Sequence, residues 1–335
     1  MVLDLVPIWT VILAFGVFMY LLLDGFDLGV GILFPFAPGD HARDLMMASL
    51  APIWDGNETW LVLGGLALFA AFPLAFAIIL PALYFPLLAM VLGLIFRGVA
   101  FELRPATTMT SKRWDHAFFW GSLIATFAQG CVLGKFVLGF AVSGRQYAGT
   151  SWDWVHPFVL AVGVGLVFGY LLLGATWLVM KTEGALQDWA RTKARVGLFG
   201  TLGFIGMVSL WTPFLDTRIA ARWFSWPNLA FLAPVPIATA AIAWWLWRSL
   251  ARGRDAAPFV AAMGLFATCY LGLAISLFPY IVPPTITLWD AAAAPQSQAF
   301  LLIGTLFLLP IILMYTGWSY WVFRGKVKIE TRHEH

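Results

Sequence analysis

Two pairs of acidic residues stand inside stretches that are otherwise apolar. The first stretch ends in DGFDLGVG, which contains Asp24 and Asp27, and the second opens with WDGNETW, which contains Asp55 and Glu58. An ionisable group inside a membrane costs about 2.5–3.5 kcal/mol on insertion scales, so such groups mark either a function or a pairing.

The third apolar stretch closes with FRGVAFELR, which adds Arg97 and Glu102. The members of each acidic pair are three residues apart, so they share a helix face. We expect one cluster in which the acids face Arg97. Carboxyl groups this close cannot all be ionised in a low dielectric, so at least one should keep its proton unless Arg97 compensates. A carboxyl poised in this way can relay protons.

Neighbouring residues in the same motifs are candidates for supporting the acids. Gly25 and Gly29 make room beside the first pair, either for a neighbouring helix or for water. Trp54, Gly56 and Asn57 surround the second pair. The competing interpretation is that the arginine and the acids only hold helices together, because burial alone does not distinguish the two roles.

Histidine, the commonest haem ligand, is scarce and poorly placed. His41 lies in a loop, His116 and His156 lie at the ends of apolar stretches, and His333 and His335 lie in the tail. Haem in a membrane bundle commonly needs His or Met as axial ligand. We therefore expect this chain to hold no haem alone. With no phosphate-binding glycine motif and no metal-ligand spacing, we also predict no metal site and no catalytic residue of its own.

The elements that must position these groups are membrane helices. The sequence is 61% hydrophobic and 11% charged, with a mean hydropathy of +0.85, whereas soluble domains average about 25% charged residues. Lipid cannot satisfy open strand edges, so the fold is expected to be all-α. A span needs about 20 apolar residues. We predict one transmembrane domain over 1–335 with nine helices, at roughly 6–35, 53–72, 76–103, 116–142, 155–180, 196–215, 228–250, 258–280 and 298–323.

Basic residues predict the orientation of this bundle. Of the 20 Lys and Arg, 15 fall in alternate loops and the tail, while only Arg145, Arg218 and Arg222 fall in the opposite loops. The positive-inside rule places the N-terminus in the periplasm and the C-terminus in the cytoplasm. All three acidic motifs then fall in the cytoplasmic half. The net charge of +3 is too small to indicate nucleic acid as a partner.

The same motifs resemble a known family. DGFDLGVG, WDGNETWL and FRGVAFELR are similar to three signatures of subunit II of cytochrome bd-type terminal oxidases. The C-terminal FPYIVPPTITLWDAAAAPQSQ and LPIILMYTGWSYWVFRGKV are similar to the end of that subunit. The resemblance runs from about residue 6 to residue 328 and is strongest for the cyanide-insensitive oxidase branch.

That resemblance implies a function in aerobic respiration at the bacterial inner membrane. The complex oxidises membrane quinol and reduces dioxygen to water. Subunit I of the family binds two b-type haems, one d-type haem and the quinol. Subunit II is expected to carry no haem, to stabilise subunit I and to conduct cytoplasmic protons toward the oxygen site. Lipid surrounds the complex, and the resemblance leaves open a bound quinone and a small single-helix third subunit.

The resemblance also assigns roles to residues. Asp55 matches the family's proton-path carboxylate, and Asp27 and Arg97 match positions that line the same polar region. Glu102 falls where the family has an acid, whereas Glu58 replaces a residue that is often neutral. Two other classes stay open: a proton-coupled secondary transporter, although no inverted repeat is visible here, and a purely structural scaffold subunit.

Overall fold

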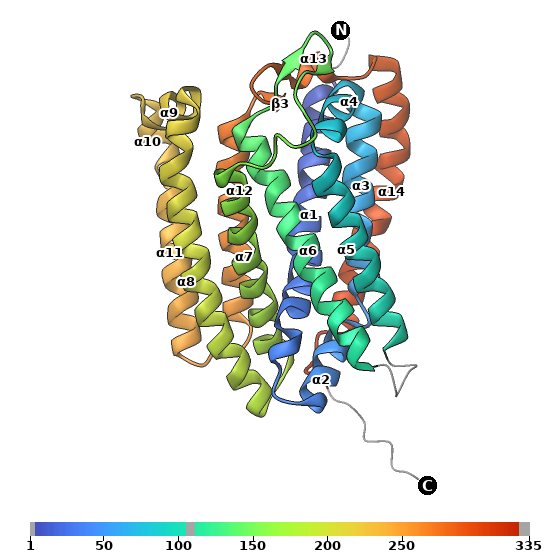
Figure 1. The fold of residues 1–335 in the computed structure, drawn as a ribbon, viewed down its shortest axis with the longest axis vertical. Helices are drawn as coiled ribbons and strands as arrows, with labels where there is room; N and C mark the ends of the chain where they lie inside the picture. The colour runs from blue at the N-terminus through green and yellow to red at the C-terminus, as the bar shows by residue number, and fades with distance from the viewer. Residues whose placement is uncertain (1–3, 105–110, 328–335) are drawn as a thin grey trace.

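The computed structural model describes residues 4–104 and 111–327. This part of the chain is a bundle of long helices that run between two ends of the molecule (Figure 1). Eight of them are apolar and long enough to cross a membrane alone, and the pair α3–α4 makes a ninth span when counted together. The long helices are α1 (Val6–Leu33), α3 (Trp54–Ala71), α5 (Tyr84–Leu103), α6 (Ser111–Leu138), α7 (Pro157–Lys181), α8 (Gly184–Leu215), α11 (Pro234–Ala251), α12 (Ala257–Leu277) and α14 (Pro295–Val322).

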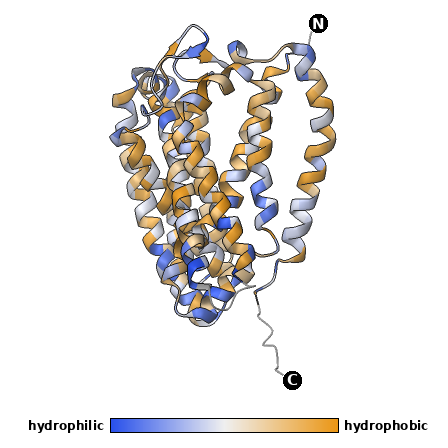
Figure 2. Cartoon of the chain, turned by 45° about the vertical axis from the view of Figure 1, so that its right-hand side comes forward, coloured by the Kyte–Doolittle hydropathy of each residue, from blue (hydrophilic) through white to orange (hydrophobic). Residues whose placement is uncertain are grey.

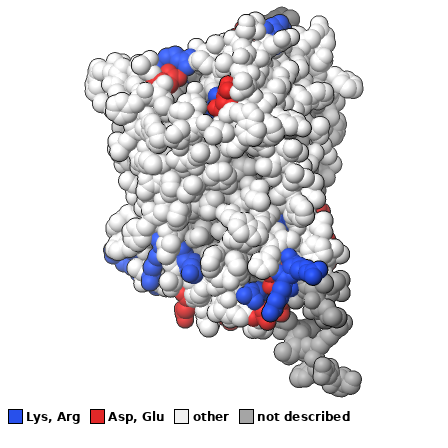
Figure 3. Space-filling model, viewed as in Figure 1, with Lys and Arg blue, Asp and Glu red and all other residues white. Residues whose placement is uncertain are grey.

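The surface has the polarity expected of a membrane protein. Apolar residues line the helices along their length, and hydrophilic ones gather mainly at the two ends (Figure 2). On the face drawn in Figure 3, Lys and Arg concentrate at the end that carries α2 (Asp40–Leu50), and the middle is free of charge. The all-α membrane bundle predicted from the sequence is confirmed.

One predicted helix, 76–103, is wrong as a single element. The chain instead forms α4 (Pro73–Ala82) and α5, and α4 is bent by 120° from α3. The break that divides the predicted helix lies at Leu83, because Pro86 has no N–H to donate to the carbonyl oxygen of Ala82. The bend between α3 and α4 lies at Phe72, since a proline such as Pro73 disfavours the helical conformation in the residue before it. The short α4 therefore turns near the end where the chain begins, and α3 and α5 span the bundle (Figure 1).

Short elements at the two ends were not predicted, because a search for about 20 apolar residues passes over them. In addition, α8 begins at Gly184 rather than near 196, since its first turns are polar and leave no hydropathy signal. The two hairpins are antiparallel, and β3–β4 contains an irregularity between Tyr280 and Val282. The short elements are η1 (Phe34–Phe36), α2, α9 (Thr217–Phe224), α10 (Asn228–Leu232), α13 (Leu288–Ala291), β1 (Val142–Ser143), β2 (Gln146–Tyr147), β3 (Tyr280–Val282) and β4 (Ile286–Thr287).

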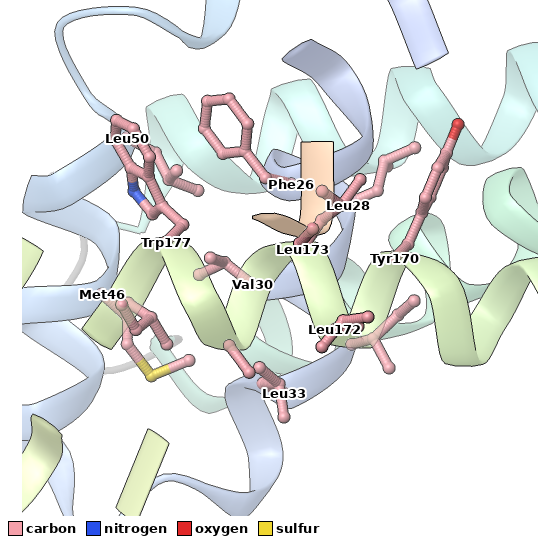
Figure 4. Close-up of a cluster of buried hydrophobic side chains, with 14 of the residues drawn as sticks. Phe26, Leu28, Val30, Leu33, Met46, Leu50, Tyr170, Leu172, Leu173 and Trp177 are labelled. Carbon is pink, nitrogen blue, oxygen red and sulfur yellow. The ribbon is translucent and has the colours of Figure 1, made fainter. Parts of the chain in front are cut away.

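The central helix α1 packs closely on α7 through glycines. A Cβ atom on Gly29 would lie 1.8 Å from the carbonyl oxygen of Tyr170, and one on Gly174 would lie 2.3 Å from the carbonyl carbon of Gly29. Next to this contact, Phe26 stacks on Trp177 with ring centroids 4.3 Å apart, inside the apolar cluster of Figure 4. The sequence left open whether the glycines of α1 make room for a neighbouring helix or for water. The structure shows the approach of a neighbouring helix.

This contact gives a first testable prediction. Gly29→Ala should destabilise the protein by about 1–3 kcal/mol, because the added methyl group forces α1 and α7 apart. Gly203→Ala on α8 is the matched control, since nothing lies within 4 Å of its Cβ position and alanine is about 1 kcal/mol better than glycine within a helix. Thermal unfolding of the purified protein should shift in opposite directions for the two variants. A Gly29→Ala protein that unfolds no earlier than wild type would contradict this packing.

Candidate functional site

The structure brings the acids of α1 and α3 to the arginine of α5. Arg97 Nη2 lies 2.8 Å from Asp24 Oδ1, and the same guanidinium donates a hydrogen bond to Glu58 Oε1. Asp24 and Asp27 are fully buried and Arg97 is 1% exposed. The Glu58 side chain, in contrast, is 30% exposed. The cluster therefore has three ionisable groups inside the bundle and one at its edge.

Asn57 joins the second buried acid to the end of the chain. Its Nδ2 donates to Asp27 Oδ2 at 2.8 Å, and its Oδ1 accepts from the Tyr320 hydroxyl of α14 at 2.9 Å. The amide is thereby fixed in one orientation and α14 is tied to α1 and α3. Sequence reasoning placed Asn57 beside the acids but missed Tyr320, because an aromatic residue in an apolar helix carries no pattern that sets it apart.

A second polar branch leaves the cluster on the other side of Asp24. Tyr20 lies one turn before Asp24 on α1, so the two share a face. The Tyr20 hydroxyl accepts from Gln129 Nε2 at 2.7 Å, and Gln129 Oε1 accepts from the Tyr170 hydroxyl at 2.8 Å. All three side chains are buried. This branch joins α1, α6 and α7 and was also missed, although Gln129 within an apolar stretch was the available signal.

Two predicted members, Asp55 and Glu102, lie outside the buried cluster. Both are exposed, on α3 and α5 respectively. A helix turns by about 100° per residue, so Asp55 points about 200° away from Asn57, which faces the core. Glu102 is five residues beyond Arg97 and is likewise rotated away. The expectation that one cluster contains every acid is therefore wrong for these two, and their roles remain predictions.

The remaining motif residues pack around the cluster. The Arg97 guanidinium lies 5.8 Å from the centroid of the Trp54 ring, and that ring lies 5.1 Å from the ring of Phe101. A Cβ atom on Gly25 would lie 2.7 Å from the Tyr170 ring, so this glycine lets α7 approach. Gly56 lies near Tyr315 of α14 at ordinary contact distance.

The described residues were compared with the ligand sets of metal and haem sites. Across residues 4–104 and 111–327, no three His, Cys, Asp or Glu side chains are arranged to hold a metal ion. Of the histidines in these ranges, His41 and His116 are exposed, and the half-buried His156 caps α7 by accepting from the Phe158 amide. These residues do not fit the axial ligation of a haem between helices.

Comparison with known proteins identifies the family. A family model described as cytochrome bd terminal oxidase subunit II matches residues 5–323. The chain belongs to this family. This chain is 28% identical to cytochrome bd-I ubiquinol oxidase subunit 2 of Escherichia coli (strain K12), over 96% of this chain and 95% of that relative. It is 29% identical to cytochrome bd ubiquinol oxidase subunit 2 of Bacillus subtilis (strain 168), over 96% of each chain.

A solved structure shows the same fold. A chain of the bd oxidase from Geobacillus thermodenitrificans superposes with a TM-score of 0.77 at 18% identity, over 96% of this chain and 99% of that one. Membership of this family makes the chain a multi-pass protein of the bacterial inner membrane. It also makes the chain part of an oxidoreductase complex that includes a partner subunit I. Family membership also implies that the complex contains haem. It excludes the alternative that the chain is a proton-coupled secondary transporter.

Proposed function

We propose that this subunit stabilises a haem-bearing subunit I and conducts cytoplasmic protons to the oxygen-reduction site through the Asp24–Arg97–Glu58 cluster. One observation carries the proposal: Asp24 and Glu58 share the guanidinium of Arg97, and a third carboxyl, that of the fully buried Asp27, lies one turn from Asp24. The guanidinium cannot balance three ionised carboxylates in a low dielectric, so the cluster is suited to hold and pass on a proton.

The orientation of the path follows from the charged end of the bundle. Lys and Arg concentrate at the end that carries α2 (Figure 3), so we place that end in the cytoplasm. Asp55 then lies in the first turn of α3 at the cytoplasmic surface, and Glu58 lies one turn deeper. A proton collected by Asp55 passes to Glu58 and from there to Asp24 beside Arg97. This order keeps the proton-path role that the resemblance implies for Asp55.

Buried polar atoms beyond this chain of carboxyls support a hydrated path. In the part of the chain that the structure describes, Asp27 Oδ1, Ser122 Oγ and Thr126 Oγ1 are buried and have no hydrogen-bonding partner. Polar atoms that the protein leaves unsatisfied are where ordered water binds. Such water would connect the acids of α1 with the hydroxyl groups of α6.

The exposed acids also indicate where subunit I packs. Asp55 and Glu102 are exposed near the cytoplasmic ends of α3 and α5, where a partner subunit can pack against them. The spanning window of α14, which lies beside α3, is only 6% buried. We therefore place subunit I, with its two b-type haems, d-type haem and quinol site, against α3, α5 and α14. Covering this face is how the chain would stabilise its partner.

A defined route has an energetic reason. Reducing dioxygen to water consumes protons, and a membrane potential of 100 mV changes the free energy of moving one charge across the membrane by about 2.3 kcal/mol. Protons taken from the cytoplasmic side, while quinol protons leave on the other side, separate charge without a pump. The residues of this chain need only hold protons at Asp55, Glu58 and Asp24 in turn and keep the route closed to other ions.

The test compares carboxyl groups on and off this route. Asp55→Asn and Glu58→Gln should each lower quinol-driven oxygen uptake by at least about tenfold, equivalent to about 1.4 kcal/mol in the barrier, with unchanged haem spectra. Asp290→Asn, at the opposite end of the bundle and exposed, is the control. Normal turnover in both route variants would support the scaffold alternative, and loss of the haems would show that these acids serve assembly.

A further inference from the structure

A cavity at the cytoplasmic end has the features of an anion site. It lies between the turn that joins α2 to α3 and the last turns of α7 and α14, and its volume is about 130 Å³. The cavity is lined by Ser49, Pro52, Ile53, Trp177, Met180, Lys181, Tyr320, Phe323 and Arg324.

Lys181 is the unusual residue of this lining. It is 4% exposed, its ammonium donates a hydrogen bond to the carbonyl oxygen of Phe323, and it lies 5.2 Å from the centroid of the Trp177 ring. A carbonyl and an aromatic ring do not neutralise a full charge. No ion pair among the described residues includes Lys181, and a buried charge without a counter-charge is costly.

Lys326 links Asp255 to the carbonyl oxygen of Thr182, the residue after Lys181, but Asp255 already pairs with other cations. Asp255 Oδ1 lies 2.6 Å from Arg191 Nη2, and its Oδ2 lies 2.8 Å from Lys326 Nζ. Burial tends to raise the pKa of Asp255, but the hydrogen bond and charge of Lys326 and the charge of Arg191 lower it below its ordinary value. Asp255 is therefore ionised and shared between two partners, and Lys181 is left without a carboxylate.

A second cation makes the cavity positive overall. Arg324 lines it, and one Nη atom of Arg324 donates to the carbonyl oxygen of Trp321, which leaves other donors of the guanidinium available. Two cations at the mouth oppose the passage of protons, so the cavity is poorly suited as their entrance. The remaining lining includes apolar groups such as Ile53, Met180 and Phe323.

The position of the cavity distinguishes a lipid from a free ion. It lies where α7 and α14 reach the cytoplasmic end of the bundle, at the level expected for lipid headgroups. Basic pockets between membrane helices on this side bind anionic headgroups. We propose that the cavity binds the phosphate of an anionic phospholipid of the inner leaflet, with Lys181 as the main cationic contact and Arg324 as the second.

The test uses the intact oxidase complex, delipidated in a neutral detergent. Phosphatidylglycerol should raise the unfolding temperature and be retained in native mass spectra, whereas phosphatidylcholine with the same acyl chains should do neither. Lys181→Met should weaken phosphatidylglycerol binding at least about tenfold. Without lipid, the variant should unfold no earlier than wild type, because methionine removes an uncompensated buried charge and keeps its volume.

Arg252→Gln is the control, because Arg252 is exposed at the end of α11 and does not line the cavity. Equal stabilisation of Lys181→Met and wild type by phosphatidylglycerol, or an equal effect of phosphatidylcholine on wild type, would overturn the proposal. If inorganic phosphate alone gives the full shift, the site takes a small anion and the lipid assignment is wrong. Should Lys181→Met fail to assemble, Arg324→Gln provides the same comparison, with the same outcomes deciding it.

Discussion

Arg97→Met is expected to destabilise the subunit by about 3–5 kcal/mol, because it leaves the buried Asp24 and the half-buried Glu58 without their shared cation. The loss should appear as earlier thermal unfolding of the purified complex and as a lower haem content per protein. The side chain also packs against Trp54, but methionine keeps much of that apolar contact. The electrostatic loss should therefore dominate.

Two further variants test whether the loss of stability is specific to Arg97 or follows the removal of any paired arginine. Arg104 pairs with Asp44 and Asp115 at the surface, so Arg104→Met should cost only about 1 kcal/mol. In the double variant Arg97→Met with Asp24→Asn, the buried carboxylate is gone as well, and much of the stability should return. If Arg97→Met and Arg104→Met lose equal stability and the double variant regains no stability, the cluster is not held together by this ion pair.

Asp24→Asn is expected to reduce quinol-driven oxygen uptake by at least about tenfold, since an amide of nearly the same shape cannot accept and release a proton. Haem spectra should be unchanged, because neutralising one buried acid next to Arg97 still leaves Glu58 as its partner. Asp44→Asn on α2 is the matched control, as that carboxyl is 51% exposed and outside the cluster. Unimpaired turnover in Asp24→Asn would leave the ion pair as structural only.

Much of this architecture could be predicted from the sequence. Long apolar stretches predict membrane helices because the bilayer sets a minimum length, and the spacing of Asp24 and Asp27 predicts that they share a face. The meeting of Asp24 with Glu58 and Arg97 followed from short connections between consecutive helices. These inferences depend on local geometry alone.

Other features depend on how helices rotate and pack against one another. α3 is apolar around most of its circumference, so its pattern does not indicate which face points to the core. Asp55 was therefore expected in the cluster, whereas Asn57 is the residue that reaches it. The break at Leu83 was missed because the apolar stretch continues through it without a change in hydropathy. Tyr320 and Gln129 are distant in sequence from the acids, so only the tertiary fold shows that they extend the polar network.

The central claim is that protons reach the oxygen site through the carboxyl cluster of this chain. It is tested most directly by mixing the fully reduced complex with dioxygen beside a pH-indicator dye and timing proton uptake in wild type and Asp24→Asn. The account predicts normal oxygen binding in the variant and proton uptake slowed by at least about tenfold. Proton uptake at the wild-type rate would contradict it.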